Sequence, residues 1–385
     1  MQKEILPLTS LRFVAAFYVF LFHIHIRWPL ASPSSTWGRF LSHGACGMSI
    51  FFILSGFVLG YRFQNGIKNY KSYLFGRFSR IYPAYFLAAL LTIPWLISSI
   101  GESNANLHFG KYLFVVLANI LVIQAWFPQL FTYWNDGGSC SISVEMFFYI
   151  LSPFLINSLK EVSNKNLYRS LIFFYFAASM PGISSLLFLP NNQSFVVFYA
   201  IPVFRVSEFI IGIICGLLFA RGLHIPRPNL SAVLCLITLC IYLAYSNFDF
   251  LFVTDNWMVV PLLAFLLLST ATVSSGVLYD FWSNSVFIYL GRISYSFYSF
   301  QVLIILLVIT KHDAIVNKYP FLANNYMLGF VMFSVLILLS SLSYHLIENK
   351  FRHYLNNKFN ERTNSEQAPG ALLYNSQQPQ LNFTI

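Results

Sequence analysis

Charge is scarce in this sequence. Only 9% of its 385 residues are Asp, Glu, Lys or Arg, whereas 57% are apolar. Soluble domains carry about 25% charged residues. This chain has too few charged side chains to solvate its surface, so its composition excludes a soluble globular protein. Near-uncharged runs of about 18 to 25 residues recur along the whole length, and each is long enough to cross a bilayer core. We therefore expect an all-α fold, a polytopic membrane helical bundle.

Motifs for nucleotide hydrolysis and for zinc binding are also missing. The sequence has no P-loop, no GxSxG, no HExxH and no paired CxxC spacing. Its five cysteines lie in or beside apolar runs, where we interpret them as packing residues. The formal net charge of +10 is explained by basic loops that orient the membrane helices. We expect contacts with membrane lipids, no metal and no nucleic acid.

The apolar windows pose a problem of parity. Eleven windows are long enough to cross: 8–28, 45–61, 81–100, 111–128, 141–159, 168–189, 196–220, 230–247, 256–275, 284–310 and 327–347. If all crossed from a cytoplasmic N-terminus, more basic residues would lie outside than inside, against the positive-inside rule. A non-crossing or re-entrant 141–159 segment restores the rule. We therefore predict about ten transmembrane helices in a cell inner (plasma) membrane, with both termini cytoplasmic.

The membrane domain is expected to span residues 1–355. Residues 356–385 are rich in Asn, Gln, Ser and Pro and lack apolar periodicity. Such a composition cannot bury enough apolar surface to fold. We predict a disordered cytoplasmic tail.

The first window carries two polar residues at membrane depth. A charge at the centre of a span costs about 2.5 to 3.5 kcal/mol, so it marks a functional or a paired site. Arg12 and His23 are eleven residues apart, which places them within about 20° of one helix face and about 16 Å apart along the axis. Taken alone, Arg12 could instead extend to the interface, and His23 could be a satisfied structural histidine.

Two arginines stand one turn apart before the third window. Arg77 and Arg80 are expected at its cytoplasmic entrance, with Pro83 in the first helical turn. Two guanidinium groups on one face can hold phosphate oxygens. Contact with lipid headgroups is the simpler alternative.

Further carboxylates lie in apolar segments. Glu145 follows Ser139 and Ser141, and a carboxylate there is either neutral or paired. Both states suit proton transfer or positioning of a substrate. Arg205 and Glu208 are three residues apart, and we favour a structural ion pair for them.

Taken in order, these segments resemble the acyltransferase-3 family of integral membrane acyltransferases. The resemblance rests on the Arg12 to His23 spacing and on five blocks between residues 8 and 348: "GMSIFFILSGFVL", "RFSRIYP", "SISVEMFFYIL", "FRVSEFIIGIICG" and "GRISYSFYSFQ". It implies an acyl-CoA donor, acetyl-CoA first of all, on the cytoplasmic face. It also implies O-acyl transfer to a carbohydrate or lipid-linked glycan such as O-antigen, capsule or exopolysaccharide.

The resemblance also implies residue roles. His23 is expected to act as general base on the acceptor hydroxyl or to mediate an acyl relay. Arg12 is expected to support the pantetheine arm or the phosphate charge, and Arg77 and Arg80 to hold the nucleotide phosphates. The residues expected to orient donor or acceptor are Glu145, Ser139 and Ser141.

The sequence departs from the family pattern at three places. Ser49 stands where many relatives have Asp, so that position offers His23 no carboxylate partner. Gln301 stands where a histidine is frequent, and Cys140 where a tryptophan is usual. These departures leave the reaction class unchanged and the acceptor open.

Two other classes of function remain as alternatives. A secondary transporter or acyl exporter could use the same buried charges, although it predicts inverted repeats and no clear pair is present. A nonenzymatic scaffold for envelope assembly would leave Arg12, His23, Arg77 and Arg80 without a shared purpose.

Overall fold

The computed structural model describes residues 4–100, 105–130, 140–188, 193–246, 255–351 and 354, and these ranges contain helices and no strand. The α-helices are α1 (Leu6–Arg27), α2 (Thr36–Ser42), α3 (Gly47–Arg62), α4 (Tyr70–Leu91), α5 (Ile93–Ile100), α6 (Ala105–Ile120), α7 (Cys140–Leu159), α8 (Asn164–Phe188), α9 (Gln193–Ala200), α10 (Pro202–Ala220), α11 (Pro228–Tyr245), α12 (Asn256–Thr272), α13 (Val277–Trp282), α14 (Ser285–Lys318) and α15 (Asn325–Ser343). A π-helical stretch, Tyr344–Glu348, follows α15. The tail predicted from residue 356 lies outside the described residues.

Within the described ranges, seven helical stretches are long and apolar enough to cross a membrane. They are Leu6–Arg27, Thr36–Arg62, Cys140–Leu159, Pro202–Ala220, Pro228–Tyr245, Ser285–Lys318 and Asn325–Phe351. Two further apolar helices, Phe109–Ile120 and Asn256–Thr272, are shorter. The expected all-α membrane bundle is confirmed. The figure of about ten crossings, the cytoplasmic termini and the choice of membrane stay predictions.

The 141–159 window, expected to be a non-crossing or re-entrant segment, is an uninterrupted helix, α7. Glu145 lies beside Ser55, and Asn157 lies beside Ile67, so α7 runs alongside α3 in the same direction. The helix of the 111–128 window, α6, is apolar only over Phe109–Ile120, less than the roughly 20 residues that a bilayer core requires. That 141–159 is the window that does not cross remains a prediction, with α6 as the structural alternative.

The third window also differs from its prediction. The side chain of Asn69 accepts a hydrogen bond from Ser72 N at 2.9 Å and caps α4, so the helix begins at Tyr70 rather than near residue 81. Pro83 therefore lies in the helix interior and not in its first turn. Arg77 and Arg80 are consequently held on a formed helix, with fixed spacing toward the centre of the bundle.

Glycines allow the central helices to touch through their backbones. A Cβ atom on Gly56 of α3 would lie 2.1 Å from the carbonyl oxygen of Phe209 in α10, and one on Gly212 of α10 would lie 2.0 Å from that of Ile53. Small residues at four-residue spacing permit such close approach. Gly56 and Gly212 therefore act as packing residues, and α3 and α10 form the closest helix pair in the described part of the chain.

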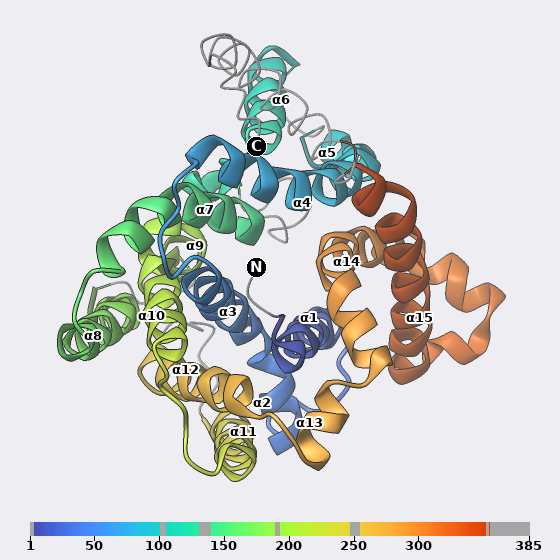
Figure 1. Cartoon of the computed structure of the whole chain (residues 1–385). Coiled ribbons are helices and arrows are strands. Elements are labelled where there is room, and N and C mark those ends of the chain that lie inside the picture. Colours follow the sequence, from blue (N-terminus) through green and yellow to red (C-terminus); the bar gives the residue numbers. More distant parts are fainter. Residues whose placement is uncertain are drawn as a thin grey trace, which may run out of the picture.

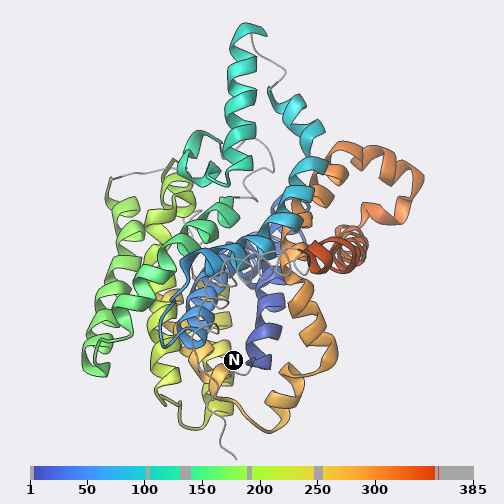
Figure 2. The same cartoon turned by 45° about the horizontal axis from the view of Figure 1, so that its top comes forward.

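Helices α1 and α14 form a second close pair. A Cβ atom on Gly291 would lie 2.0 Å from the carbonyl oxygen of Thr9, and the rings of Phe13 and Phe20 pack 5.5 and 5.7 Å from that of Phe297. Residue numbers rise together along the two helices, so they are parallel. Figures 1 and 2 show α1, α3, α4, α7 and α14 grouped around the middle of the bundle, with α8 and α11 at its edge.

The Arg205–Glu208 ion pair predicted from spacing is present and fully buried. Arg205 Nε lies 2.9 Å from a Glu208 carboxylate oxygen, and Arg205 also donates to Ser49 Oγ at 2.9 Å. Asn256 donates to Glu208 at 3.2 Å. The guanidinium is packed between the rings of Phe52 and Tyr199, each 5.1 Å away. This network joins α3, α9, α10 and α12, and it shows that Ser49 serves Arg205 rather than His23.

Candidate functional site

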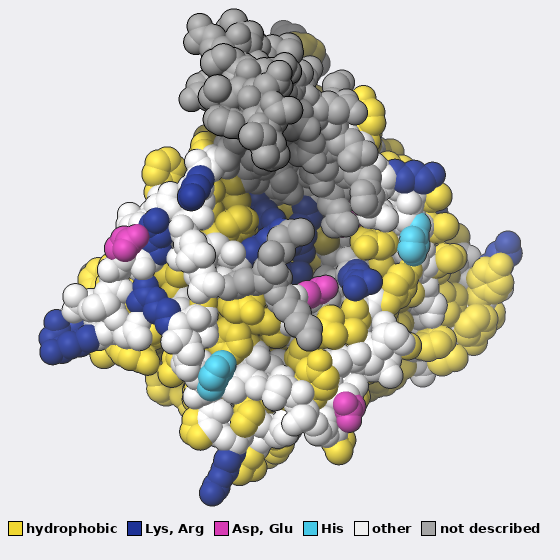
Figure 3. Space-filling view, in the orientation of Figure 1, with side chains coloured by type: hydrophobic (Ala, Val, Ile, Leu, Met, Phe, Trp, Pro, Cys, Tyr) yellow, Lys and Arg dark blue, Asp and Glu magenta, His cyan; other side chains and the backbone are white. Residues whose placement is uncertain are grey.

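A basic cavity of about 670 Å³ opens between the ends of five helical segments. Five arginines line it together with two carboxylates: Arg12, Arg62, Arg77, Arg80 and Arg292, with Glu4 and Glu348. Figure 3 shows basic side chains gathered in a hollow at the middle of this face. The surplus of positive charge makes the cavity attractive to a polyanion, because low-dielectric walls concentrate the field of the lining charges.

Most of these arginines are free to bind an anion. Among the described residues, Arg12, Arg62, Arg77 and Arg80 have no carboxylate within 4.0 Å, whereas Arg292 lies 3.9 Å from Glu4. The Arg77 Nε atom is buried without a hydrogen-bond partner in the described part of the chain. Its guanidinium stands 5.9 Å from the ring of Tyr149, which holds it toward the cavity. A buried donor without a partner indicates a place for a ligand oxygen or a water molecule.

A narrower pocket of about 40 Å³ adjoins the basic cavity. The two share Arg12, Arg80, Ser294 and Tyr295 in their walls. Beyond these shared residues the pocket wall becomes mostly aromatic and aliphatic: Met48, Phe51, Phe52, Ile142, Tyr149 and Tyr298. The site is therefore a wide basic mouth that leads to a slender, largely apolar inner part.

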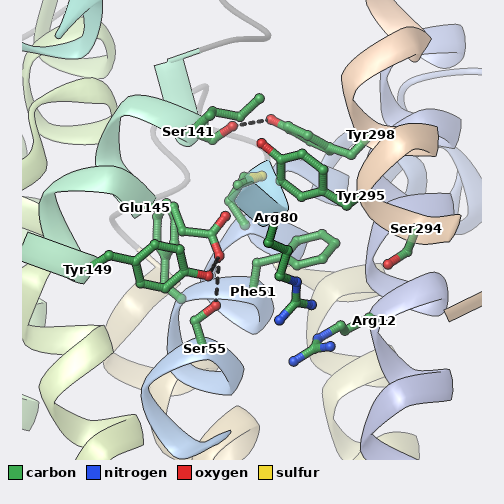
Figure 4. Close-up of a pocket in the computed structure, with 13 residues that line it drawn as sticks. Arg12, Phe51, Ser55, Arg80, Ser141, Glu145, Tyr149, Ser294, Tyr295 and Tyr298 are labelled. Carbon is green, nitrogen blue, oxygen red and sulfur yellow. Dashed lines mark hydrogen bonds between the residues drawn. The ribbon is translucent and has the colours of Figure 1, made fainter. Parts of the chain in front are cut away.

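Glu145 faces the two shared arginines across this pocket, as Figure 4 shows. Its carboxylate accepts a hydrogen bond from Ser55 Oγ at 3.0 Å and another from the hydroxyl of Tyr149. Both donors hold the carboxylate in place while Arg12 and Arg80 act on it through space. The predicted pairing of Glu145 thus takes the form of two hydroxyl bonds, opposite two guanidinium groups.

Tyrosines of α14 complete the wall, and sequence reasoning did not assign them a role. The hydroxyl of Tyr298 lies 2.5 Å from Ser141 Oγ, which joins α14 to the first turn of α7. The Tyr295 hydroxyl is buried without a hydrogen-bond partner among the described residues. Their three-residue spacing in "GRISYSFYSFQ" places both on one helix face, which is the signal that could have found them.

His23 lines neither the basic cavity nor the narrow pocket. Its Nδ1 atom is buried and has no hydrogen-bond partner in the described ranges. The structure thus brings Arg12, Arg80, Glu145 and Ser141 to one pocket and leaves His23 farther along α1. The predicted Ser139 lies outside the described residues.

Comparison with known proteins gives a family that agrees with this arrangement. A family described as an acyltransferase domain, acyltransferase-3, matches residues 7–346. Acyltransferase MdmB of Streptomyces mycarofaciens is 28% identical over 56% of this chain and 57% of its own length. Two other similar proteins carry O-acetyltransferase names. That of Staphylococcus aureus strain COL is 20% identical over 91% of this chain and 58% of its own length, and the peptidoglycan O-acetyltransferase YrhL of Bacillus subtilis is 22% identical over 91% and 55%.

The chain spans less than two thirds of the length of each of these relatives. No solved structure matches it significantly.

Proposed function

The chain belongs to the acyltransferase-3 family, and on this premise we propose that it is a membrane O-acyltransferase with an acyl-CoA donor. The acyl group, acetyl first of all, passes to a hydroxyl group of an envelope carbohydrate or lipid-linked glycan. The observation that carries the proposal is the basic cavity with its narrow apolar continuation. A coenzyme A thioester has the matching shape, because a polyanionic nucleotide is followed by a thin pantetheine arm.

Donor binding follows from the charges of the cavity. Arg77 and Arg80 lie one turn apart on α4 and face the same cavity as Arg12. They bind the nucleotide phosphates by charge-assisted hydrogen bonds, which are about twice as strong as neutral ones. The pantetheine arm enters the narrow pocket past Arg12 and Arg80, which line both spaces. The Glu145 carboxylate, held by two hydroxyl groups, accepts hydrogen bonds from the amide groups of the pantetheine arm and so orients the arm.

The chemical step uses His23 as general base. The imidazole takes the proton of the acceptor hydroxyl while the oxygen attacks the thioester carbonyl. The new C–O bond forms, the C–S bond breaks, and the coenzyme A thiolate leaves with a proton returned by the imidazolium. Arg12 lies about 16 Å before His23 on the same helix, which is the interval that the pantetheine arm bridges.

The sidedness follows from the same segments. The basic cavity is built from the start of α1, the end of α3, the first half of α4, the start of α14 and the π-helical stretch after α15, and each of these segments is predicted to lie toward the cytoplasm. The donor is therefore expected from the cytoplasm, and the acceptor from the opposite side, which His23 approaches.

The test is a transfer assay with radiolabelled acetyl-CoA in inverted inner-membrane vesicles that contain the chain. We expect labelled carbohydrate with wild type and none with His23→Ala, although both proteins are inserted equally. Mass spectrometry of the product then locates the acetyl group on its sugar. Labelled carbohydrate that forms equally with His23→Ala would overturn the general-base assignment, and transport of acetyl-CoA without any transfer would favour an exporter.

A further inference from the structure

Gln301 is a buried amide whose hydrogen bonds are missing. Its side chain has no exposed surface on α14, yet neither Nε2 nor Oε1 has a hydrogen-bond partner among the described residues. Its surroundings supply no substitute, because Phe300, Leu303 and Ile304 around it belong to an apolar cluster. Buried amides are normally satisfied, since an unpaired one loses its hydration without compensation.

The packing of two helices brings Gln301 to His23. Along α1 and α14, Thr9 meets Gly291, and Phe20 meets Phe297. One helical turn beyond Phe297, Gln301 reaches the level of His23, and the interaction between the two side chains places the amide close to the imidazole ring. His23 Nδ1 is also buried without a partner in the described ranges. Two buried polar groups, His23 Nδ1 and the Gln301 amide, thus lie close together beside an apolar cluster.

The position of this pair relative to the narrow pocket adds a functional meaning. Tyr298, which lines that pocket, precedes Gln301 by three residues on the same helix. Gln301 therefore lies about one helical turn past the pocket wall on α14. Arg27 on α1 interacts with the His23 ring through its charge, and no carboxylate of the described residues has such an interaction with the ring.

We propose that Gln301 is the positioning residue of His23. Its amide oxygen accepts a hydrogen bond from the N–H group of the imidazole, which fixes the tautomer and leaves the other nitrogen free for the acceptor hydroxyl. The amide NH2 group of Gln301 is then still available to donate a hydrogen bond to an oxygen atom of the acyl acceptor. An amide can orient a catalytic histidine in this way, as Asn does in Cys-His-Asn proteases. Catalytic hydrogen bonds are frequently loose without substrate and tighten when it binds, which accounts for the unformed bonds.

A neutral orienting group has a chemical consequence. A carboxylate would add a full negative charge beside the imidazolium that forms during transfer, whereas the amide adds only a dipole. The Ser49 hydroxyl, which could have supplied hydrogen bonding from α3, is engaged by Arg205 at 2.9 Å. The orientation of His23 therefore depends on α14. This inference rests on the proposed function.

The test compares full-length variants in the vesicle assay with labelled acetyl-CoA, measured as a function of pH. Gln301→Met keeps the volume and removes the hydrogen bonds, and we expect the transfer rate to fall about tenfold or more. The acidic limb of the pH–rate profile of Gln301→Met should move to lower pH, because the imidazolium of His23 loses a hydrogen-bond acceptor. Gln301→Glu should move the same limb to higher pH, because a carboxylate stabilises the imidazolium. Gln124→Leu is the matched control, since Gln124 is a buried amide that donates to Tyr85 instead.

Opposite displacements of the acidic limb cannot come from a packing defect, which would lower the rate without moving the profile. A Gln301→Met variant that stays within twofold of the Gln124→Leu control would overturn the inference. Acidic limbs that coincide in both variants and in wild type would overturn it as well. Absence of labelled carbohydrate with wild type would instead overturn the proposed function, so the two failures are distinguishable.

Discussion

The hydroxyl groups of Ser141 and Tyr298 lie 2.5 Å apart and close the wall of the narrow pocket between α7 and α14. We expect Tyr298→Phe to raise the KM for acetyl-CoA several-fold, because the bond that orders the wall is lost, and a neutral hydrogen bond contributes about 0.5–1.5 kcal/mol. The kcat should change less than threefold. Kinetics of Ser141→Ala, Tyr298→Phe and the double variant check this, since the double should resemble either single. A fall in kcat at constant KM would instead place Tyr298 in the chemical step.

The arginine pair of α4 should determine affinity for the donor. Arg77→Gln and Arg80→Gln are each expected to raise the KM for acetyl-CoA at least tenfold, because a charge-assisted hydrogen bond contributes about 1.5–3 kcal/mol. Arg169→Gln, an exposed arginine of α8, is the charge-matched control and should leave the KM unchanged.

A second donor separates the phosphates. One of Arg77 and Arg80 is expected to bind the 3′-phosphate. With acetyl-3′-dephospho-CoA, replacing that arginine should not raise the KM further, whereas replacing the other should still raise the KM in full. If neither variant alters the KM for either donor, the basic cavity does not bind the nucleotide.

The Arg205–Glu208 network should dominate the stability of the bundle centre. Arg205→Met leaves the fully buried Glu208 carboxylate without its cation, and breaking a buried pair in this way costs about 3–5 kcal/mol. We expect a clear fall in the Tm of the detergent-purified chain. Arg205→Met combined with Glu208→Met should recover much of that loss, because no uncompensated charge remains. A single variant with the wild-type Tm would show that the pair is dispensable.

Close contact between α3 and α10 should make Gly56 intolerant of any side chain. Because the added Cβ of Gly56→Ala would meet the backbone oxygen of Phe209 at 2.1 Å, the helices must separate. We expect loss of the monodisperse peak in size-exclusion chromatography after detergent extraction. Gly110→Ala is the matched control, since nothing lies within 4 Å of its Cβ, and it should elute as wild type. Equal behaviour of both variants would contradict the close packing.

Local rules were sufficient where the partners are close in sequence. The Arg205–Glu208 pair follows from a three-residue spacing on one helix, and the structure contains it. The membrane character follows from composition alone. The start of α4 was misplaced because hydropathy was weighed without the Asn69 cap, which begins the helix eleven residues before the predicted window.

The site itself depends on partners far apart in the chain. Glu145 and Ser55 are separated by 90 residues, and Ser141 and Tyr298 by 157, so no periodicity could pair them. The convergence of Arg12 with Arg80 was expected from family resemblance and not from spacing. Aromatic residues were the hardest to interpret, because 19% of the chain is Phe, Trp or Tyr and the three-residue spacing of Tyr295 and Tyr298 is hard to single out among so many rings.

The parallel pair of α1 and α14 has a consequence for biosynthesis. The Ser10 hydroxyl donates to the carbonyl oxygen of Trp282, a residue 272 positions later, and Thr9 packs against Gly291. A nascent chain inserts α1 long before its neighbour emerges from the ribosome. Until translation has passed Gly291, α14 is absent, and Arg12 lies in the bilayer next to lipid headgroups or to an insertase. A chain that stops short of α14 leaves the face of α1 that carries Thr9 and Phe13 without the helix that covers it.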